Sequence, residues 1–132
     1  MRIYVAGPLT DIAAVQAVQA AVMAAGHELA LDWTRAPDVT LVEDYGSAPA
    51  LSASLASDDL EAVLRADAVL VVMSEEEGKG MFVELGAALA RAHRGELQHV
   101  VLLGPISQES VFYFHPAVQR MTSVDEWLAS IA

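Results

Sequence analysis

The sequence predicts an α/β protein, a single-domain Rossmann-like three-layer sandwich with a mostly parallel sheet of about four to five strands. Strand-like and helix-like stretches alternate along the chain, which is typical of βαβ units. The apolar run DAVLVVM at 67–73 is uninterrupted, as expected for a strand buried on both faces of a parallel sheet. The chain has 132 residues, 55% of them hydrophobic, which suits one core better than two, so we expect one domain over 1–132.

The first half of the chain predicts two strands and two helices. Asp11, in the turn after the first strand, is a candidate N-cap for the first helix, and Gly26 is expected to close that helix. Pro, Gly and Asp residues after Thr34 indicate an irregular segment. The expected order is a strand over 1–6, a helix over 12–26, a strand over 27–33, an irregular stretch over 34–49 and a helix over 49–66.

The second half continues this alternation. In parallel sheets of this kind, ligands bind beyond the carboxyl ends of the strands. The loops GPLTD at 7–11 and SEEEGKG at 74–80 both lie at that edge, so we expect the functional site there. The expected order is a strand over 67–73, the loop over 74–80, a helix that carries Glu84, a strand over 99–103, a loop from Gly104 and a last helix over 123–131.

The composition narrows the class of partner. The net charge is −11, and the seven Lys and Arg residues are scattered and form no basic stripe, so we expect neither nucleic acid nor an anionic membrane surface as a partner. The absence of cysteine excludes disulfides and thiolate chemistry. No apolar run approaches the roughly 20 residues of a membrane span, and the chain starts directly in a strand, which favours a cytoplasmic protein with small-molecule partners.

Glu84 is an unexpected residue on an apolar helix face. Its neighbours at helical spacing form a stripe that is expected to be buried, which places its carboxylate on that side or at its border. Carboxylates are seldom buried without a partner or a function. The nearby positive end of the helix favours the ionised form and burial opposes it, so the sequence leaves the charge of Glu84 open. The stripe consists of Met81, Leu85, Ala88, Leu89 and Ala92.

Asp59 repeats this pattern on the preceding helix. It falls on a stripe formed by Leu51, Leu55, Leu60, Val63 and Leu64. A structural ion pair or a helix cap is the alternative role for one such residue. Two such carboxylates on helices that flank the same strand favour a site, because cleavage of a glycosidic bond uses one group to attack the anomeric carbon and another to protonate the leaving atom. Tyr4 in the first strand is by itself most simply a core aromatic.

Other familiar motifs are absent. GKG at 78–80 lacks the Ser or Thr of a Walker loop, and no G-x-G-x-x-G occurs, so no dinucleotide cofactor is indicated. No G-x-S-x-G predicts a serine nucleophile. The acidic run at 75–77 is usually a solvated loop, although it leads directly towards Glu84. The histidines His27, His93, His99 and His115 show no metal-ligand spacing, so we expect no metal and no cofactor.

Three segments carry a family resemblance. IYVAGPLTD at 3–11, SDDLEAVLRADAVLVV at 57–72 and GKGMFVELGAALA at 78–90 resemble the nucleoside 2-deoxyribosyltransferases and the related 2′-deoxynucleoside 5′-monophosphate N-glycosidases. The resemblance implies a Rossmann-like fold with Glu84 as the nucleophile, Asp59 assisting and Tyr4 orienting the nucleophile and the sugar. The substrate would then be lined by residues of the two loops, Gly7, Pro8, Leu9, Glu77, Gly78, Gly80 and Met81.

The chain also departs from the family pattern. Met81 stands where a hydroxyl residue is common, and Gly78 stands where members carry Asp or Ser, with Glu77 beside it as a substitute. The nucleotide hydrolases place Arg-Gly-Gly after the first strand, whereas this chain has Leu-Thr-Asp at 9–11, which would repel a phosphate. The chain contains no asparagine, although the transferases take a base-contacting asparagine from a neighbouring subunit.

The expected activity is therefore cleavage or transfer at the N-glycosidic bond of a 2′-deoxynucleoside, through a covalent deoxyribosyl–Glu84 intermediate and with a free base as product. One alternative is a 2′-deoxynucleoside 5′-monophosphate N-glycosidase, and another is a non-catalytic nucleotide-binding domain of the same fold. The resemblance also implies a homo-oligomer, at least a dimer. An apolar cluster at 111–114 in the loop after the fourth strand suggests the contact, with Ser107, Ser110 and Tyr113 near the neighbour's site.

Overall fold

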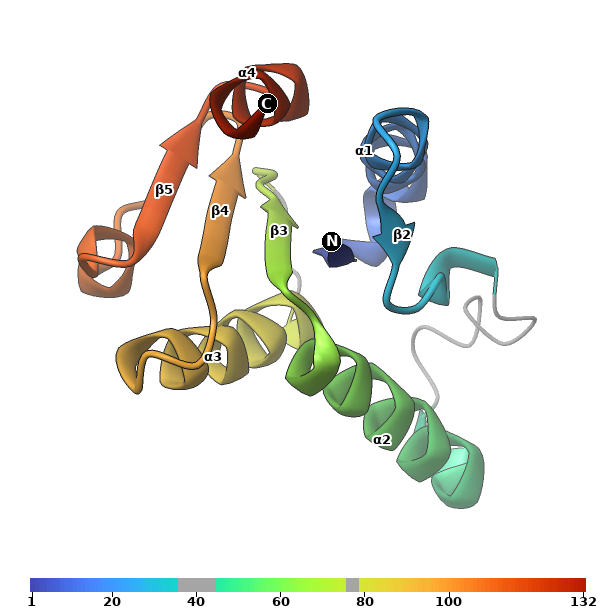
Figure 1. Ribbon diagram of the computed structural model, residues 1–132. Helices are drawn as coiled ribbons and strands as arrows, with labels where there is room; N and C mark the ends of the chain where they lie inside the picture. The colour runs from blue at the N-terminus through green and yellow to red at the C-terminus, as the bar shows by residue number, and fades with distance from the viewer. Residues whose placement is uncertain (36–44, 76–78) are drawn as a thin grey trace.

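The computed structural model describes residues 1–35, 45–75 and 79–132 and confirms the predicted α/β sandwich. All pairings of its five-stranded sheet are parallel, in the order β2-β1-β3-β4-β5 (Figure 1). The switch in strand order between β1 and β3 marks the edge where such sheets bind ligands. The strands are β1 (Arg2–Ala6), β2 (Glu28–Leu29), β3 (Ala68–Val72), β4 (His99–Leu103) and β5 (Val118–Met121).

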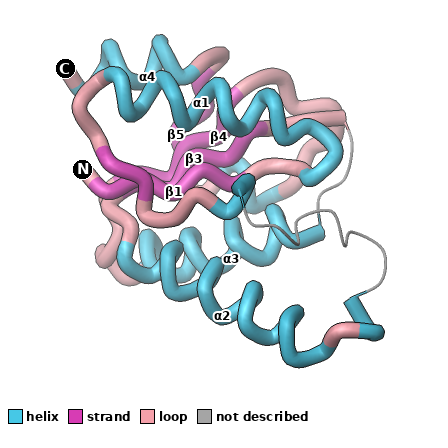
Figure 2. The backbone as a smooth tube through the Cα atoms, turned by 90° about the vertical axis from the view of Figure 1, so that its right-hand side faces the viewer, coloured by secondary structure: helices cyan, strands magenta, loops and turns pink. Residues whose placement is uncertain are grey.

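Helices cover both faces of the sheet (Figure 2). α1 (Ile12–Ala24) and α4 (Val124–Ile131) pack on one face, whereas α2 (Pro49–Arg65) and α3 (Lys79–His93) pack together on the other. Because α2 and α3 each lead into a parallel strand, both run from the carboxyl edge of the sheet towards its amino edge. Short 3-10 turns lie at η1 (Leu9–Asp11), η2 (Trp33–Arg35), η3 (Tyr45–Ser47) and η4 (Val111–Phe114).

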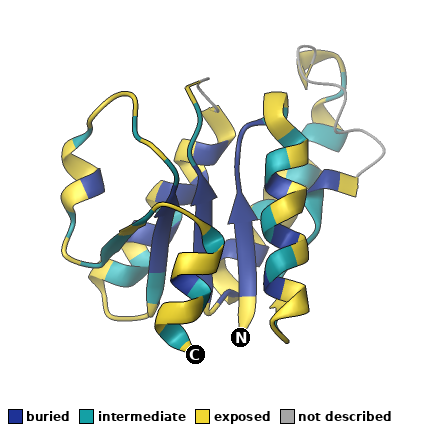
Figure 3. Ribbon diagram, turned by 90° about the horizontal axis from the view of Figure 1, so that it is seen from above, coloured by how far each residue is buried: buried dark blue, intermediate teal, exposed yellow. Residues whose placement is uncertain are grey.

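The three central strands β1, β3 and β4 are largely buried (Figure 3), and they lie between two apolar layers. Side chains alternate along each strand, so neighbouring residues enter different layers. In β1, Tyr4 joins the layer under α2 and α3, whereas Val5 joins the layer under α1 and α4. Tyr4 therefore faces the two helices that carry the predicted carboxylates, although its burial alone would have suggested a purely structural ring.

Several predicted helix ends are confirmed. The Asp11 carboxylate accepts the amide of Ala14 at 3.2 Å and so caps α1. Gly26 follows the end of α1 with φ +92°, a conformation that glycine adopts without strain. Gly7 has a packing role between β1 and α1, because a Cβ atom there would overlap the Val15 side chain.

The second strand is shorter than predicted. The pattern indicated a strand over 27–33, but β2 ends at Leu29. Beyond that point the carbonyl of Val5 accepts the indole Nε1–H of Trp33 at 2.7 Å, so a side chain occupies the position that a further strand amide would take. The chain then turns into η2, where Asp32 accepts the Thr34 hydroxyl at 2.6 Å. The predicted irregular stretch at 34–49 lies mainly outside the described residues.

Two other expectations need correction. The apolar stripe of α2 was expected to include Leu60 and Leu64, but these side chains are 38% and 52% exposed. Val63 of the expected stripe is buried, together with Ala62, a small residue that lets α2 lie close to the sheet. The strand β5 falls where only a loop was expected; its residues are mixed in polarity and lie at the sheet edge, which weakens the sequence signal.

The loop between β4 and β5 folds back onto its own chain. Tyr113 is only 7% exposed and joins the core beneath α2 and α3. Arg120 lies 5.3 Å from the centre of the Phe114 ring. The His93 and His115 rings are joined by a nitrogen-to-nitrogen contact of 3.1 Å.

In the part of the chain that the structure describes, no helix is long and apolar enough to cross a membrane.

Candidate active site

Tyr4 and Glu84 meet in the core at the carboxyl edge of the sheet. The Tyr4 hydroxyl donates a hydrogen bond to Glu84 Oε2 across a separation of 80 residues. Tyr4 is fully buried, and Glu84, in the second turn of α3, is only 9% exposed. The carboxylate that the sequence predicted on a buried face is therefore buried, with a neutral hydroxyl as its hydrogen-bond partner.

Asp59 lies close to this pair on α2. Its negative charge contributes to raising the pKa of both Tyr4 and Glu84, so the three side chains form one electrostatic group. Among the described residues its carboxylate has no ion-pair or hydrogen-bond partner. The alternative roles considered for Asp59, a structural ion pair or a helix cap, thus find no partner in this part of the chain.

Burial sets the protonation of the group. It raises the pKa of Glu84 to about 7; the Tyr4 hydroxyl lowers this pKa and Asp59 raises it further. Burial, followed by the neighbouring charge of Asp58, raises the pKa of Asp59 to about 6. Burial and the two carboxylates also raise the pKa of Tyr4, so it remains a neutral donor. At Glu84, whose charge the sequence had left open, burial therefore outweighs the Tyr4 hydrogen bond, which favours the ionised form.

Two carboxyl groups that titrate close to neutrality, beside a fixed hydroxyl donor, form an acid–base pair. Tyr4 engages one oxygen of Glu84 and leaves Oε1 for another contact. An ionised Glu84 can act as a nucleophile or stabilise a developing positive charge. A protonated Asp59 can donate its proton to a leaving group. Retaining cleavage of a glycosidic bond requires this division of roles, and the form that has it is the minor one of the two singly ionised forms, because Asp59 has the lower pKa.

The residues predicted to bind substrate have different environments. Gly7 and Pro8 are buried and Leu9 is half-buried where β1 leads into α1. Met81 is buried in the same core cluster as Tyr4, whereas Gly80 is exposed at the start of α3. The remaining two predicted residues, Glu77 and Gly78, lie outside the described residues.

The residues predicted to lie near the site of a neighbouring subunit also have different environments. Ser107 is exposed. Ser110 accepts the amide of Phe112 at 3.3 Å and caps η4. Tyr113 packs into its own core, so its ring does not belong to the outer surface of η4. That surface is formed by Val111, Phe112 and Phe114, which are 78%, 65% and 63% exposed.

Two residues that contact the elements carrying the site were not singled out in the sequence. Trp33 lies where β1 ends, with its indole bonded to Val5 beside Tyr4. The sequence could have indicated Trp33, because it is a tryptophan at the end of a predicted strand, near the ligand-binding edge. Arg91 follows Glu84 by two helical turns on α3 and contacts α2. Its signal was a lone arginine on the helix face that carries Glu84. Within the described residues, no group of three or more His, Asp or Glu side chains is arranged to hold a metal ion.

The chain matches no protein-family model, and no curated protein matches its sequence. Among solved structures, it is similar to the CMP N-glycosidase BcmB of Clostridium botulinum, with a TM-score of 0.58 and 13% sequence identity. The similarity covers 99% of this chain and 98% of that chain. At this identity the similarity shows the fold, and it extends over the whole chain rather than over one βαβ unit.

Proposed function

We propose that this protein is an enzyme that cleaves or transfers at the N-glycosidic bond of a 2′-deoxynucleoside, with retention of configuration at the anomeric carbon. The observation that carries the proposal is the group formed by the buried Tyr4 and Glu84 and the half-buried Asp59, whose two carboxyl groups titrate near neutrality. The resemblance to nucleoside 2-deoxyribosyltransferases and the shared fold with a nucleotide N-glycosidase support the same class of reaction.

In the first step, the ionised Glu84 attacks C1′ of the sugar. A bond forms between C1′ and a Glu84 oxygen, the bond between C1′ and the base nitrogen breaks, and its electron pair stays on the base. Asp59 supplies the proton that neutralises the departing base. Tyr4 keeps its hydrogen bond to Oε2, which orients the carboxylate so that Oε1 faces the sugar.

In the second step, an acceptor attacks C1′ of the deoxyribosyl–Glu84 intermediate. Asp59, now ionised, takes the proton from the acceptor, and Glu84 is released as a carboxylate. A second base as acceptor makes the reaction a transfer, whereas water makes it a hydrolysis. Chemically, the step needs no group beyond the two carboxylates and the acceptor.

A nucleoside 5′-monophosphate is the second candidate substrate. The fold similarity to a CMP N-glycosidase favours it. The turn after β1 opposes it, because Asp11 stands where a phosphate-binding site would need positive charge and is already engaged in capping α1. Turnover of matched nucleosides and 5′-monophosphates separates the two, since a nucleotide enzyme loses most of its rate when the phosphate is removed.

We also infer that the protein forms a homo-oligomer, at least a dimer, through the outer surface of η4. Val111, Phe112 and Phe114 place three large apolar side chains on one short turn, each more than half exposed. Exposed apolar patches of this kind commonly mark contact sites between proteins.

We also propose a cytoplasmic location, on the basis of the cysteine-free composition.

The deciding experiment is release of free base from a panel of 2′-deoxynucleosides and their 5′-monophosphates, each with and without an acceptor base. We expect release that depends on Glu84 and is lost in Glu84→Gln, with Glu61→Gln as the matched control, because Glu61 is exposed on α2. Base exchange with an added acceptor would identify a transferase. No release from any substrate, combined with tight binding of a nucleotide, would favour the non-catalytic alternative.

A further inference from the structure

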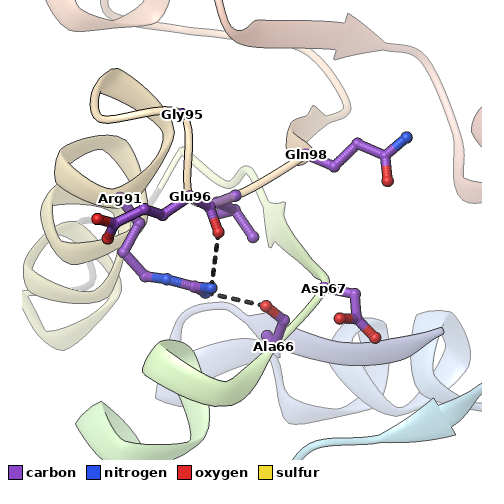
Figure 4. Close-up of a pocket in the computed structure, with 7 residues that line it drawn as sticks. Ala66, Asp67, Arg91, Gly95, Glu96 and Gln98 are labelled. Atoms are coloured by element: carbon purple, nitrogen blue, oxygen red, sulfur yellow. Dashed lines mark hydrogen bonds between the residues drawn. The ribbon is translucent and has the colours of Figure 1, made fainter.

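Arg91 connects the two helices that carry the carboxylates. Its Nη1 donates hydrogen bonds to the carbonyls of Val63 at 2.7 Å and Ala66 at 2.9 Å, both at the C-terminal end of α2. Its Nη2 donates to the carbonyl of Glu96 at 3.0 Å, in the turn after α3 (Figure 4). Arg91 forms no ion pair among the described residues, so its charge is directed at backbone carbonyls.

The Ala66 carbonyl is one that the end of α2 leaves without an intrahelical partner, whereas the Val63 carbonyl also accepts the Ala66 amide at 3.4 Å. A cation there also interacts favourably with the negative end of the α2 dipole. Arg91 lines a shallow pocket with Asp67, Glu96 and Gln98 at the amino edge of the sheet, the end opposite Glu84 (Figure 4). Because the Arg91 donors are directed at the protein's own backbone, we interpret the pocket as the space around these hydrogen bonds and not as a ligand site. We call the contact of Arg91 with the end of α2 the Arg91 clamp.

The Arg91 clamp and the two carboxylates are separated by the same number of residues on both helices. Arg91 follows Glu84 by seven residues on α3, and Ala66, the C-cap of α2, follows Asp59 by seven residues. Seven residues correspond to about two helical turns, or about 10 Å along each axis. Since α2 and α3 run in the same direction, a contact between Arg91 and Ala66 brings Asp59 and Glu84 to the same level.

We propose that Arg91 is a positioning residue, which holds α2 and α3 in the register that places Asp59 beside Glu84. Its part in catalysis rests on the function proposed above, whereas the geometric claim does not. The carboxylates repel one another when both are ionised, and this repulsion pushes the helices apart at the carboxyl edge. Two charge-assisted hydrogen bonds from Arg91 to the carbonyls of Val63 and Ala66, two turns away, oppose that movement, and the bond to the Glu96 carbonyl holds the guanidinium in place.

The test is a carboxyl-carbon NMR titration of Glu84, which requires no substrate. Arg91→Met keeps the aliphatic stem and removes every donor. We expect the titration midpoint of Glu84 to fall by about half a pH unit or more, because Asp59 moves away and its charge no longer opposes ionisation. Arg94→Met is the matched control: it removes a charge from the turn after α3, where Arg94 pairs with Glu96 at 3.3 Å, without touching α2. It should leave the Glu84 midpoint unchanged.

A double-mutant comparison shows whether the effect passes through Asp59. In an Asp59→Asn background, Arg91→Met should no longer lower the Glu84 midpoint. Arg91→Lys retains one donor group and should give a smaller shift, and it also serves if the Met variant does not fold. A Glu84 midpoint that is unchanged in every folded Arg91 variant, with only a lower melting temperature, would overturn the proposal. So would a shift of equal size in the Asp59→Asn background.

Activity provides the second readout. In Arg91→Met we expect kcat to fall tenfold or more with a smaller change in KM, because a misplaced acid slows the chemical step. If the protein releases no base from any substrate, the proposed function fails while the titration still decides the role of Arg91. If base release depends on Glu84 but the titration does not respond to Arg91, only the positioning role is wrong.

Discussion

Replacing Glu84 by glutamine is expected to abolish base release and, above neutral pH, to stabilise the fold. Burial raises the pKa of Glu84 from 4.5 to about 7, so the folded protein binds a proton more tightly than the unfolded chain does. For a group shifted in this direction, stability is greatest below pH 4.5, falls as pH rises through the interval up to about 7, and is constant above it. A glutamine at position 84 would carry no charge at any pH, so the variant escapes this loss.

The size of the effect follows from the two pKa values. The difference is roughly 2.5 pH units at about 1.4 kcal/mol each, or about 3 kcal/mol as an upper figure. With an unfolding entropy of about 2.1 cal/mol/K per residue, the 132-residue chain would change its melting temperature by about 10 °C. The Tyr4 hydroxyl can donate to the oxygen of a glutamine side chain as well, so the substitution keeps the hydrogen bond and changes only the charge.

Calorimetry at pH 4 and pH 8 measures this effect directly. The difference in melting temperature between Glu84→Gln and the natural protein should be small at pH 4 and strongly positive at pH 8. Glu61→Gln, at an exposed site on α2, should show no comparable dependence on pH. A Glu84→Gln variant that is equally or less stable than the natural protein at pH 8 would refute the reasoning, because it would mean that the buried carboxylate does not oppose folding.

Three further outcomes are expected. The pH profile of kcat/KM should be a narrow bell with limbs near 6 and 7, from Asp59 as acid and Glu84 as nucleophile, and Asp59→Asn should remove the alkaline limb and lower turnover by about 10²-fold; a reduced melting temperature with unchanged turnover per folded molecule would make Asp59 structural. Tyr4→Phe should raise the pKa of Glu84 further, since the hydroxyl is the group that lowers it, and move the alkaline limb, which follows the higher of the two pKa values, to higher pH; an unmoved alkaline limb contradicts the contact. Phe112→Asp should convert an oligomer to a monomer in light scattering, with Gln108→Asp on the same loop as control; a natural protein that is monomeric and fully active contradicts the shared contact.

The α3 face was predictable because its pattern is local. Met81, Leu85, Ala88 and Leu89 recur at helical spacing, and each of them is buried in the structure. The same spacing therefore also places Glu84 on the buried side. A 3.6-residue period depends only on the backbone of one helix, so no knowledge of the rest of the fold is needed.

Features that depend on distant parts of the chain were not predictable in this way. The end of β2 is determined by the Trp33 indole, which occupies a carbonyl on another strand. On α2, the apolar stripe expected from the sequence included Leu60 and Leu64, whereas close packing against the sheet requires the smaller Ala62 and Ala66. In each case the deciding contact joins residues far apart in sequence, and a periodic pattern contains no information about it.

The carboxylate pair and Arg91 together suggest how this fold can hold an unfavourable group of charges. Glu84 and Asp59 both have raised pKa values, so their ionised forms oppose folding near neutral pH. In natural proteins the local preferences of the sequence usually agree with the overall fold, and residues that oppose folding occur mostly at functional sites. Here the residues that oppose folding, Glu84 and Asp59, lie at the carboxyl edge of the sheet. The Arg91 clamp, which opposes separation of the two helices, lies at their other end. This separation leaves Glu84 without a neutralising cation among the described residues, so no positive charge lowers its raised pKa of about 7.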